Sequence, residues 1–437
     1  MDYSNVDLQA LEKKLIAFRR ERHRRPENAW TEFLTTSVIT HELEKLGFSC
    51  RMGKEIHTAG DRYGVPSEAY LEQCMERAIA EGADPDLVEK MRGGYCGVVG
   101  VLDTGRPGPT TALRVDIDCN DVEECREDDH LPHREGFDSL HPKLMHACGH
   151  DGHTAIGLGV ATLVSACADQ LCGKIMIIFQ AAEEGGRGAS SVAQSGILDG
   201  VDYLFGGHLT AKMPYGQIYT GSKELACSYK VDAFFHGLNA HAGASPEAGH
   251  NAAAAAANAI LNALAISRSG KGVTRVNIGS GEFGLGRNVI PDHAVLRAEV
   301  RGGNNELNEY MFERLLHVFR SSADMYDCTF DYKIVGYSID APSDPELMEL
   351  ARACAADIGE ITAVGEYNPL AGAGDDVTFL MHEVQSHGGK ATYLAVGADG
   401  DAPHHNPRFD INEKCILTAC KLYANMIGRL NGKSGNP

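Results

Sequence analysis

The stretch Met145–His153, Met-His-Ala-Cys-Gly-His-Asp-Gly-His, places three imidazoles, one thiol and one carboxylate within nine residues. Upstream, the apolar run Ala112–Asp118 carries aspartates at alternate positions, and downstream the apolar run Ile175–Gly186 contains a pair of adjacent glutamates. Nitrogen, sulfur and oxygen donors at this density are typical of a metal site. Together with the paired carboxylates, they predict a hydrolytic metal centre.

Strands and helices alternate on both sides of this stretch. The apolar runs Tyr95–Leu102, Thr111–Ile117 and Gly173–Phe179 predict strands, and Gly152–Ala168 predicts a helix between the last two. Helical periodicity also covers Leu8–Arg24 near the start of the chain. The alternation predicts an α/β domain in which a mostly parallel sheet is flanked by helices.

After Gly221 the order of the expected strands and helices changes. The order of expected elements is strand Tyr229–Phe235, helix Asn251–Ala265, strands Val273–Gly279 and Ala294–Arg301, helix Asn305–Ala323 and strand Cys328–Tyr337. This β-α-β-β-α-β order is typical of a ferredoxin-like α+β domain. We therefore expect one domain over residues 1–225 and 341–437, into which a second domain, residues 226–340, is inserted. A chain of 437 residues is long enough for two cores.

Composition narrows the class of protein. Forty Lys and Arg against sixty Asp and Glu give a formal net charge of −20, which argues against binding to nucleic acid or to an anionic membrane. The first residues have neither the basic nor the apolar segment of a signal peptide, and no stretch is apolar and long enough to span a bilayer. Thirteen cysteines without a repeating spacing favour free thiols in a reducing compartment, so we expect a cytoplasmic protein.

The histidines and the cysteine of the central stretch have three interpretations. In an extended segment, His146, Cys148 and His150 would point to one side, so that Cys148 and His150 could share a metal while Asp151 orients a ligand ring. Cys148 could instead be a nucleophile activated by His150. The third interpretation is a core cysteine with capping histidines beside a glycine turn.

Three further segments carry candidate groups. Glu183 and Glu184 follow a buried strand, where one carboxylate could bind a metal while the other faces the attacking water. The alternative is a pair of solvated glutamates in a loop. His208 follows another strand, and His404 and His405 lie in a polar loop near the C-terminus. Taken alone, His208 is more typical of a structural role, and the His404–His405 pair is more typical of the protein surface.

The expected insertion also contains candidates. His241 lies in a glycine-containing turn, and Arg287 with Asn288 lies in a glycine turn before a strand. In turns, histidines and asparagines most often serve to stabilise the backbone conformation. No Gly-x-Gly-x-x-Gly or Walker lysine pattern follows a strand, so a nucleotide site is not indicated.

The motifs, taken in order, resemble the M20 metallopeptidase/amidohydrolase family, and in particular its Cys-containing aminoacylase branch. The matching segments are His146–Asp151, Gln180–Gly185, His208, Ala240–Gly243, Asn288–Pro291 and His405–Pro407. The resemblance extends over essentially the whole chain. It implies a catalytic domain and an inserted domain that serves as a lid and dimerisation domain.

The resemblance also implies roles for individual residues. The ligands of two divalent metal ions, Mn or Zn, would be Cys148, His150, Glu184, His208 and His405. Glu183 would be the general base, and His241 would join a catalytic site from the inserted domain, often that of the other protomer in a dimer. Asp116, Asp118 and Asp151 would support the ligands from behind.

For the substrate, the resemblance implies an N-acyl amino acid, above all an aromatic acyl-glutamate such as p-aminobenzoyl-glutamate. An acidic enzyme needs local cations for such a substrate, and Arg187, Arg287 and Asn288 are the candidates. The alternatives are a broader N-acyl-amino-acid or dipeptide hydrolase, and a non-catalytic or partner-dependent member of a heteromer. A homodimer through the inserted domain is the expected assembly, and a heteromer with a homologous chain is the other.

Overall fold

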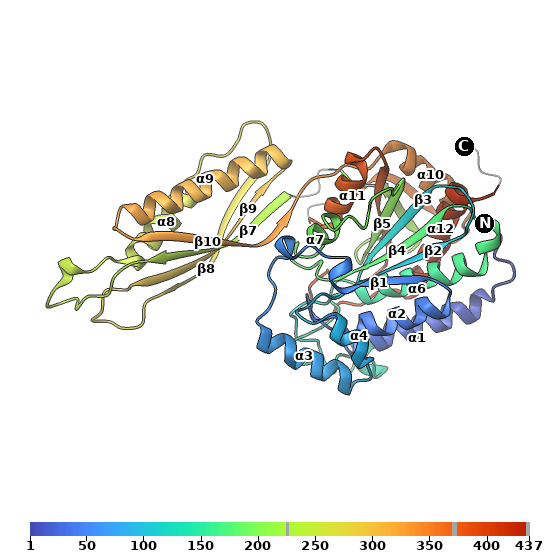
Figure 1. Cartoon of the computed structure of the whole chain (residues 1–437), viewed down its shortest axis with the longest axis horizontal. Helices are drawn as coiled ribbons and strands as arrows, with labels where there is room; N and C mark the ends of the chain where they lie inside the picture. Colours follow the sequence, from blue (N-terminus) through green and yellow to red (C-terminus); the bar gives the residue numbers. More distant parts are fainter. Residues whose placement is uncertain (224–226, 369–373, 434–437) are drawn as a thin grey trace. The chain divides into compact units, whose positions relative to one another are not determined.

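The computed structural model describes residues 1–223, 227–368 and 374–433, which fall into two compact units (Figure 1). The large unit comprises Met1–Lys223 and most of the chain from Ala341 onward, and the inserted unit is the intervening segment that ends at Asp340. Each unit has a hydrophobic core of its own. The domain boundary expected at residues 225 and 226 lies outside the described residues.

The large unit is built on an eight-stranded mixed sheet. The strands, in spatial order, are β1 (Ser49–Met52), β2 (Val98–Asp103), β4 (Lys174–Gln180), β3 (Thr110–Asp116), β5 (Tyr203–Thr210), β12 (Lys390–Gly397), β6 (Gln217–Gly221) and β11 (Ala363–Tyr367). The central run β4-β3-β5-β12 is parallel, whereas β1, β2 and β6 pair antiparallel to a neighbour. β4 reads Lys-Ile-Met-Ile-Ile-Phe-Gln and is buried after its first residue, as expected for a strand covered on both faces.

Helices flank this sheet, which confirms the expected α/β class. They are α1 (Leu8–Arg24), α2 (Phe33–Lys45), α3 (Glu68–Ala80), α4 (Pro85–Lys90), α5 (Leu131–Arg134), α6 (His150–Ala166), α7 (Ala189–Ala193), α10 (Pro345–Ala355), α11 (Val377–Ser386) and α12 (Lys414–Asn431). α6 packs against α1 and α12, and both α6 and α12 contact β3 (Figure 1). α11 packs on α7, β5 and β12.

The parallel strands place several polar side chains at one edge of the sheet. β3 ends at Asp116 and pairs there with Gln180, the last residue of β4. His208 lies near the end of β5, which continues to Thr210 rather than ending before the histidine as the sequence suggests. α6 begins at His150. Ligands of open α/β sheets bind outside the carboxyl ends of the strands, so this edge is where a site is expected.

The inserted unit has the ferredoxin-like order predicted from its sequence. Its elements are β7 (Cys227–His236), α8 (Ala252–Leu264), β8 (Thr274–Phe283), β9 (His293–Gly302), α9 (Asn305–Asp324) and β10 (Thr329–Ser338). The antiparallel sheet has the order β10-β7-β9-β8, and α8 and α9 pack together on it (Figure 1). Alternate residues of β7, such as Val231, Ala233 and Phe235, are buried with the two helices in the core.

The structure also bears on the cysteines and on membrane-spanning helices. All thirteen cysteines are free thiols. Within the described ranges, no helix has both the length and the hydropathy needed to cross a membrane.

Candidate metal centre

The five residues expected to bind metals come from four segments and meet at the carboxyl edge of the sheet. Cys148 precedes α6 and His150 begins it, Glu184 follows β4, His208 belongs to β5, and His405 lies between β12 and α12. The donor atoms of Cys148, Glu184 and His405 all lie within 4.8 Å of one another, as do those of His150, Glu183 and Glu184. The structure therefore brings the predicted ligands together.

Pairwise distances show how the donors are grouped. Cys148 Sγ lies 3.4 Å from His208 Nε2, and His405 Nε2 lies 3.4 Å from Glu184 Oε1. His150 Nε2 lies 3.9 Å from Glu184 Oε1. Cys148 therefore adjoins His208 on one side and the Glu184–His405 pair on the other.

Two buried donors of this cluster indicate that the residues fit a metal. In the described chain, His150 Nε2 and Glu184 Oε1 are buried without a hydrogen-bond partner. Buried polar atoms are normally paired, and a cation between these two atoms would satisfy both. The thiolate, imidazole and carboxylate set is the one that zinc prefers, and its carboxylate member also suits manganese.

The chain reaches this arrangement through a turn and not through an extended segment, so that part of the sequence interpretation is wrong. Gly149 has φ of 91°, a left-handed conformation that glycine adopts readily, and α6 starts at the next residue. The turn aims Cys148 and His150 at the same centre. His146 lies apart from them, buried with its ring 6.3 Å from that of His23, and burial lowers its pKa to about 3.

Asp118 holds two of the predicted ligands from behind. His150 Nδ1 lies 3.2 Å from Asp118 Oδ1, and the backbone N–H of Glu184 donates to Asp118 Oδ2 at 2.9 Å. Donation from Nδ1 leaves the lone pair of His150 Nε2 for a metal. Burial would raise the pKa of Glu184, but the neighbouring imidazoles of His405 and His150 lower it to about 2.

Asp116 lies 3.6 Å from His150 Nδ1 and also reaches the centre through His153. His153 Nδ1 lies 2.5 Å from Asp116 Oδ1, while its Nε2 accepts the backbone N–H of Leu209 at 2.9 Å. Arg114 donates to the other oxygen of Asp116 at 2.8 Å. His153 thus ties the end of β3 to β5 beside His208, whose Nδ1 donates to the carbonyl of Leu209 at 2.8 Å.

Asp151 occupies a different place from the one expected. The sequence predicts that it orients a ligand ring, but its carboxylate lies 2.6 Å from Arg19 Nε and 2.8 Å from His23 Nδ1, both on α1. All three side chains are fully buried. Asp151 therefore anchors the start of α6, which carries His150, to α1.

Glu183 adjoins the same cluster. Its Oε2 lies 3.9 Å from His150 Nε2, and the side chain is mostly buried. The preceding Ala182 has φ of 58°, and its backbone N–H donates to Glu32 Oε1 at 2.7 Å. A left-handed residue without a glycine's freedom is strained, so Glu32 helps to hold the backbone immediately before the turn that carries Glu183 and Glu184.

The sequence interpretation missed several supporting residues. His153 was counted among the donors of the central stretch but given no role of its own. Glu32 was not singled out, nor were the buried Arg114 and Asp376, whose side chains are joined at 3.1 Å. Asp376 also accepts the backbone N–H groups of Gly188 and Ala189 at the start of α7. Arg114 lies in an apolar strand, where a buried charge requires buried partners. This lone charge was the feature of the sequence that could have indicated the pair.

The remaining candidates are distributed over both units. In the large unit, Arg187 is half-buried shortly after Glu184, and its side chain has no hydrogen bond or ion pair with any described residue. In the inserted unit, His241, Arg287 and Asn288 are exposed. The backbone N–H of Ala242 donates to the carbonyl of Asn288 at 3.0 Å, which joins the loops that carry them.

The neutral ring of His241 is held in one tautomer. Its Nδ1 accepts the backbone N–H groups of Gly243 at 3.1 Å and Ala244 at 3.0 Å. A nitrogen that accepts two N–H groups carries no proton, so the ring's proton is on Nε2. His241 therefore presents a hydrogen-bond donor at the surface of the inserted unit.

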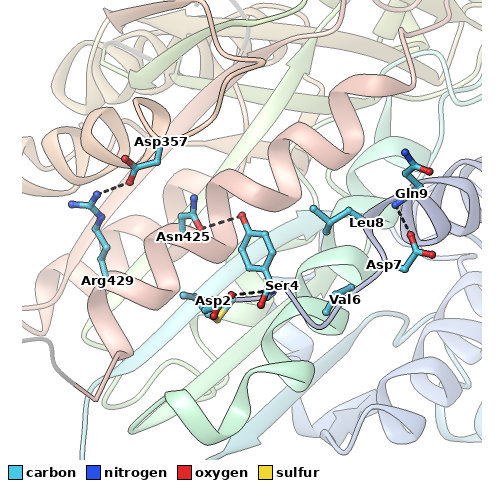
Figure 2. A pocket seen from close by; sticks show the side chains of 11 residues that line it. Asp2, Ser4, Val6, Asp7, Leu8, Gln9, Asp357, Asn425 and Arg429 are labelled. Carbon is cyan, nitrogen blue, oxygen red and sulfur yellow. Dashed lines mark hydrogen bonds and ion pairs between the residues drawn. The ribbon is translucent and has the colours of Figure 1, made fainter.

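A separate cavity of about 680 Å³ lies at the N-terminus of the large unit, against α12 (Figure 2). There Tyr3 donates to Asn425 at 3.4 Å. Arg429 pairs with Asp357 at 2.7 Å (Figure 2). None of the candidate site residues lines this cavity. It does not contribute to the metal centre.

Known proteins resemble the chain over its whole length. One is a component chain of the p-aminobenzoyl-glutamate hydrolase from Escherichia coli K12, to which it is 39% identical over 424 residues that cover 97% of each chain. This chain is also 39% identical over 425 residues to an indole-3-acetyl-aspartic acid hydrolase from Enterobacter agglomerans, and the match covers 97% of each chain.

Solved structures share the fold. The crystal structure of an aminobenzoyl-glutamate utilization protein from Klebsiella pneumoniae superposes with a TM-score of 0.85 at 33% identity and covers 98% of each chain. A dinuclear metal-binding peptidase of the M20 family from Bacillus subtilis superposes with a TM-score of 0.66 at 24% identity, covering 96% of this chain and 98% of that one. The sequence pattern of peptidase family M20/M25/M40 matches residues 112–429, and the chain therefore belongs to that family.

Proposed function

We propose that this protein hydrolyses the amide bond of an N-acyl amino acid with the help of two divalent metal ions, Mn or Zn, and that an aromatic acyl-glutamate such as p-aminobenzoyl-glutamate is its substrate. The observation that carries the proposal is the convergence of Cys148, Glu184 and His405 on one point, with Glu183 among the neighbouring donors. The names of the relatives, hydrolases of acyl-glutamate and acyl-aspartate, support the substrate class.

The two ions would be held by Cys148, His150, Glu184, His208 and His405. Cys148 lies between His208 and the Glu184–His405 pair, and His150 lies beside Glu184. When bound, the ions would polarise the substrate carbonyl and lower the pKa of water. Asp118 and His153 would keep the ligand rings in place through the hydrogen bonds described above, because the partners of a metal-bound histidine fix its tautomer and orientation.

Glu183 would move the proton in this reaction. Its carboxylate would accept a proton from the attacking water and then deliver it to the nitrogen of the leaving amino acid. His241 would donate from Nε2 to the oxygen on which negative charge develops, since its Nδ1 is occupied by two backbone N–H groups. Cys148 would then be a ligand, not a nucleophile.

The carboxylates of the amino-acid part would be bound by cations. Arg187 supports this role because it is half-buried near Glu184 without a partner among the described residues. Arg287 and Asn288 would contribute from the inserted unit. A guanidinium can bind a carboxylate through two parallel hydrogen bonds, which selects for acidic amino acids.

For the assembly, we propose a homodimer formed through the inserted unit. Leu261 and Leu264 of α8 are 71% and 49% exposed, and α8 packs beside β8, the last strand in the sheet order. An exposed apolar face beside an open strand edge is typical of an interface. The E. coli relative is named as one part of a multi-chain hydrolase, so a heteromer with a homologous chain is the second candidate.

Assay of the purified chain alone, loaded with Mn²⁺ or Zn²⁺, tests these proposals. p-Aminobenzoyl-glutamate, indole-3-acetyl-aspartate, N-acetyl-cysteine and a dipeptide form the substrate panel. Preference for the acyl-glutamate is the expected result. Equal turnover of the whole panel would favour a broad aminoacylase, and no turnover by the metal-loaded chain would favour a partner-dependent member of a heteromer.

A further inference from the structure

The adjacent histidines His404 and His405 lie on different sides of Cys148. His405 has φ of 62°, and this left-handed residue sends its ring to Glu184 while the ring of His404 turns to Cys148. His404 Nδ1 lies 3.6 Å from Cys148 Sγ. The backbone N–H of His405 donates to the carbonyl of Ala147 at 2.7 Å, which docks this loop on the residue before the cysteine.

Geometry alone makes His404 a candidate metal ligand. Its donor nitrogen forms a cluster with Cys148 and His208 in which all donor atoms lie within 4.8 Å of one another. The resemblance to known family motifs covers His405 but not His404. The role of His404 must therefore be decided from its own contacts.

The hydrogen bonds of the His404 ring fix its tautomer and thereby decide its role. The backbone N–H of Ala211 donates to His404 Nε2 at 3.2 Å. A backbone amide can only donate, so Nε2 has no proton, and the proton of the neutral ring is on Nδ1, the atom that faces Cys148. A protonated nitrogen has no lone pair for a metal.

His208 provides the opposite case at the same sulfur. Its Nδ1 donates to the carbonyl of Leu209 at 2.8 Å, so its proton is on Nδ1 and its lone pair is on Nε2. That Nε2 lies 3.4 Å from Cys148 Sγ. Cys148 thus faces one imidazole that can share a metal with it and one that can only donate a hydrogen bond to it.

The ring of His404 is also fixed by its neighbours. Its centroid lies 5.1 Å from that of Phe409 and 5.0 Å from that of His208, which meets it edge to face. We propose that His404 is a positioning residue that donates an N–H···S hydrogen bond from Nδ1 to the Cys148 thiolate and is not a metal ligand. This inference rests on the proposed function only in that Cys148 binds metal.

The hydrogen bond has consequences that can be measured. It stabilises negative charge on the sulfur and restricts the Cys148 rotamer, so the thiolate is held beside the other predicted ligands. It also lowers the energy of the sulfur electrons, which raises the energy of sulfur-to-metal charge transfer. Loss of such a supporting contact typically lowers metal affinity by about 10–100-fold.

Cobalt substitution of the full chain provides the test. Wild type, His404→Leu and His404→Asn are loaded with Co²⁺, and metal content, the sulfur-to-cobalt absorption band and Co²⁺ affinity against a competing chelator are measured. His404→Leu should retain two Co²⁺ per chain, shift the band to lower energy and lose affinity about 10–100-fold. The side-chain amide of His404→Asn can replace the Nδ1–H donor, so this variant should stay close to wild type.

Three results would overturn the inference. They are a fall in Co²⁺ content in His404→Leu, as for a lost ligand; an unchanged band in that variant; and the lack of any sulfur-to-cobalt band in wild type. His404→Ala takes the place of His404→Leu if circular dichroism shows that the latter is unfolded. A wild-type chain with the band but without amide hydrolysis would overturn the proposed function and leave this inference intact.

Discussion

Asp118 connects His150 and Glu184, two candidate ligands that lie far apart in the sequence: it lies 3.2 Å from His150 Nδ1 and accepts the backbone N–H of Glu184 at 2.9 Å. Asp118→Asn can keep one of these contacts but cannot accept both in the same way. We expect the variant to fold and to lose about 10–100-fold in metal affinity. Competition with a chelator measures this loss. The exposed Asp121→Asn is the control and should bind metal as wild type does; an equal affinity of both variants would contradict the prediction.

Replacement of Glu183 should separate chemistry from metal binding. Glu183→Gln keeps the shape of the side chain but cannot accept a proton, so kcat should fall by about 10²–10⁴-fold while the metal content stays at two ions per chain. Metal analysis and steady-state kinetics on p-aminobenzoyl-glutamate check both parts. Glu184→Gln is the matched comparison and should lose metal. Activity of Glu183→Gln within tenfold of wild type would exclude the general-base role.

The sequence was sufficient for the elements whose apolar pattern is strong. α1 has the predicted bounds Leu8–Arg24, and the ferredoxin-like order of the inserted unit was visible because its strands alternate and its helices are long. β1, β6 and β11 were not predicted. They have four or five residues each, and β6 and β11 are fixed by pairing with each other at the sheet edge, which local periodicity does not encode.

The residues of the candidate site also fall into those that the sequence could predict and those that it could not. Dense local motifs identified Cys148 and Glu184, because several donors stand close together in the sequence. The contacts behind them could not be read locally, since Asp151 meets Arg19 across 132 positions and Arg114 meets Asp376 across 262. A buried charge signals that a partner exists without saying which residue it is.

Arg187 should determine the preference for an acidic amino acid. Arg187→Ala removes a cation that has no partner among the described residues, so KM for an N-acyl glutamate should rise about 10–100-fold, the range of a charged hydrogen bond of about 1.5–3 kcal/mol. The matching N-acyl glutamine, which lacks the side-chain carboxylate, should change much less. Arg287→Ala is measured beside it. Unchanged KM values for both variants would remove the two arginines from substrate binding.

The buried contacts of α1 should make stability depend on pH. Burial alone would lower the pKa of His23, but hydrogen bonds to Asp151 and Glu124 raise it to about 9. Since this lies above the ordinary value of 6.5, His23 stabilises the fold fully below pH 6.5, and the stabilisation is lost as the pH rises through about 9. We expect the free energy of unfolding of the metal-free chain to fall by roughly 3 kcal/mol over that range.

Glu124 makes the stability of the fold depend on pH at the acidic end. Burial would raise its pKa, but hydrogen bonds from His130 and His23 lower it to about 2, so its contribution is present above pH 4.5 and is lost as the pH falls towards 2. Urea unfolding between pH 5 and 9.5 measures the alkaline part. His23→Gln should be less stable near pH 6 and should lose the alkaline decline. A decline of the same size in the variant would assign it to other groups.

The exposed face of α8 provides the test of assembly. Leu261 is 71% exposed beside β8, and burial of such side chains between two copies would stabilise a dimer. Leu261→Glu places a charge there and should shift the chain from dimer to monomer in light scattering after size exclusion. The control is Met325→Glu, which changes another exposed apolar residue of the same unit, after α9.

If wild type is a monomer, or if Leu261→Glu remains a dimer with wild-type affinity, this face is not the interface. Because His241 is expected to act in a partner's site, loss of the dimer should also lower kcat, and that loss should not accompany Met325→Glu.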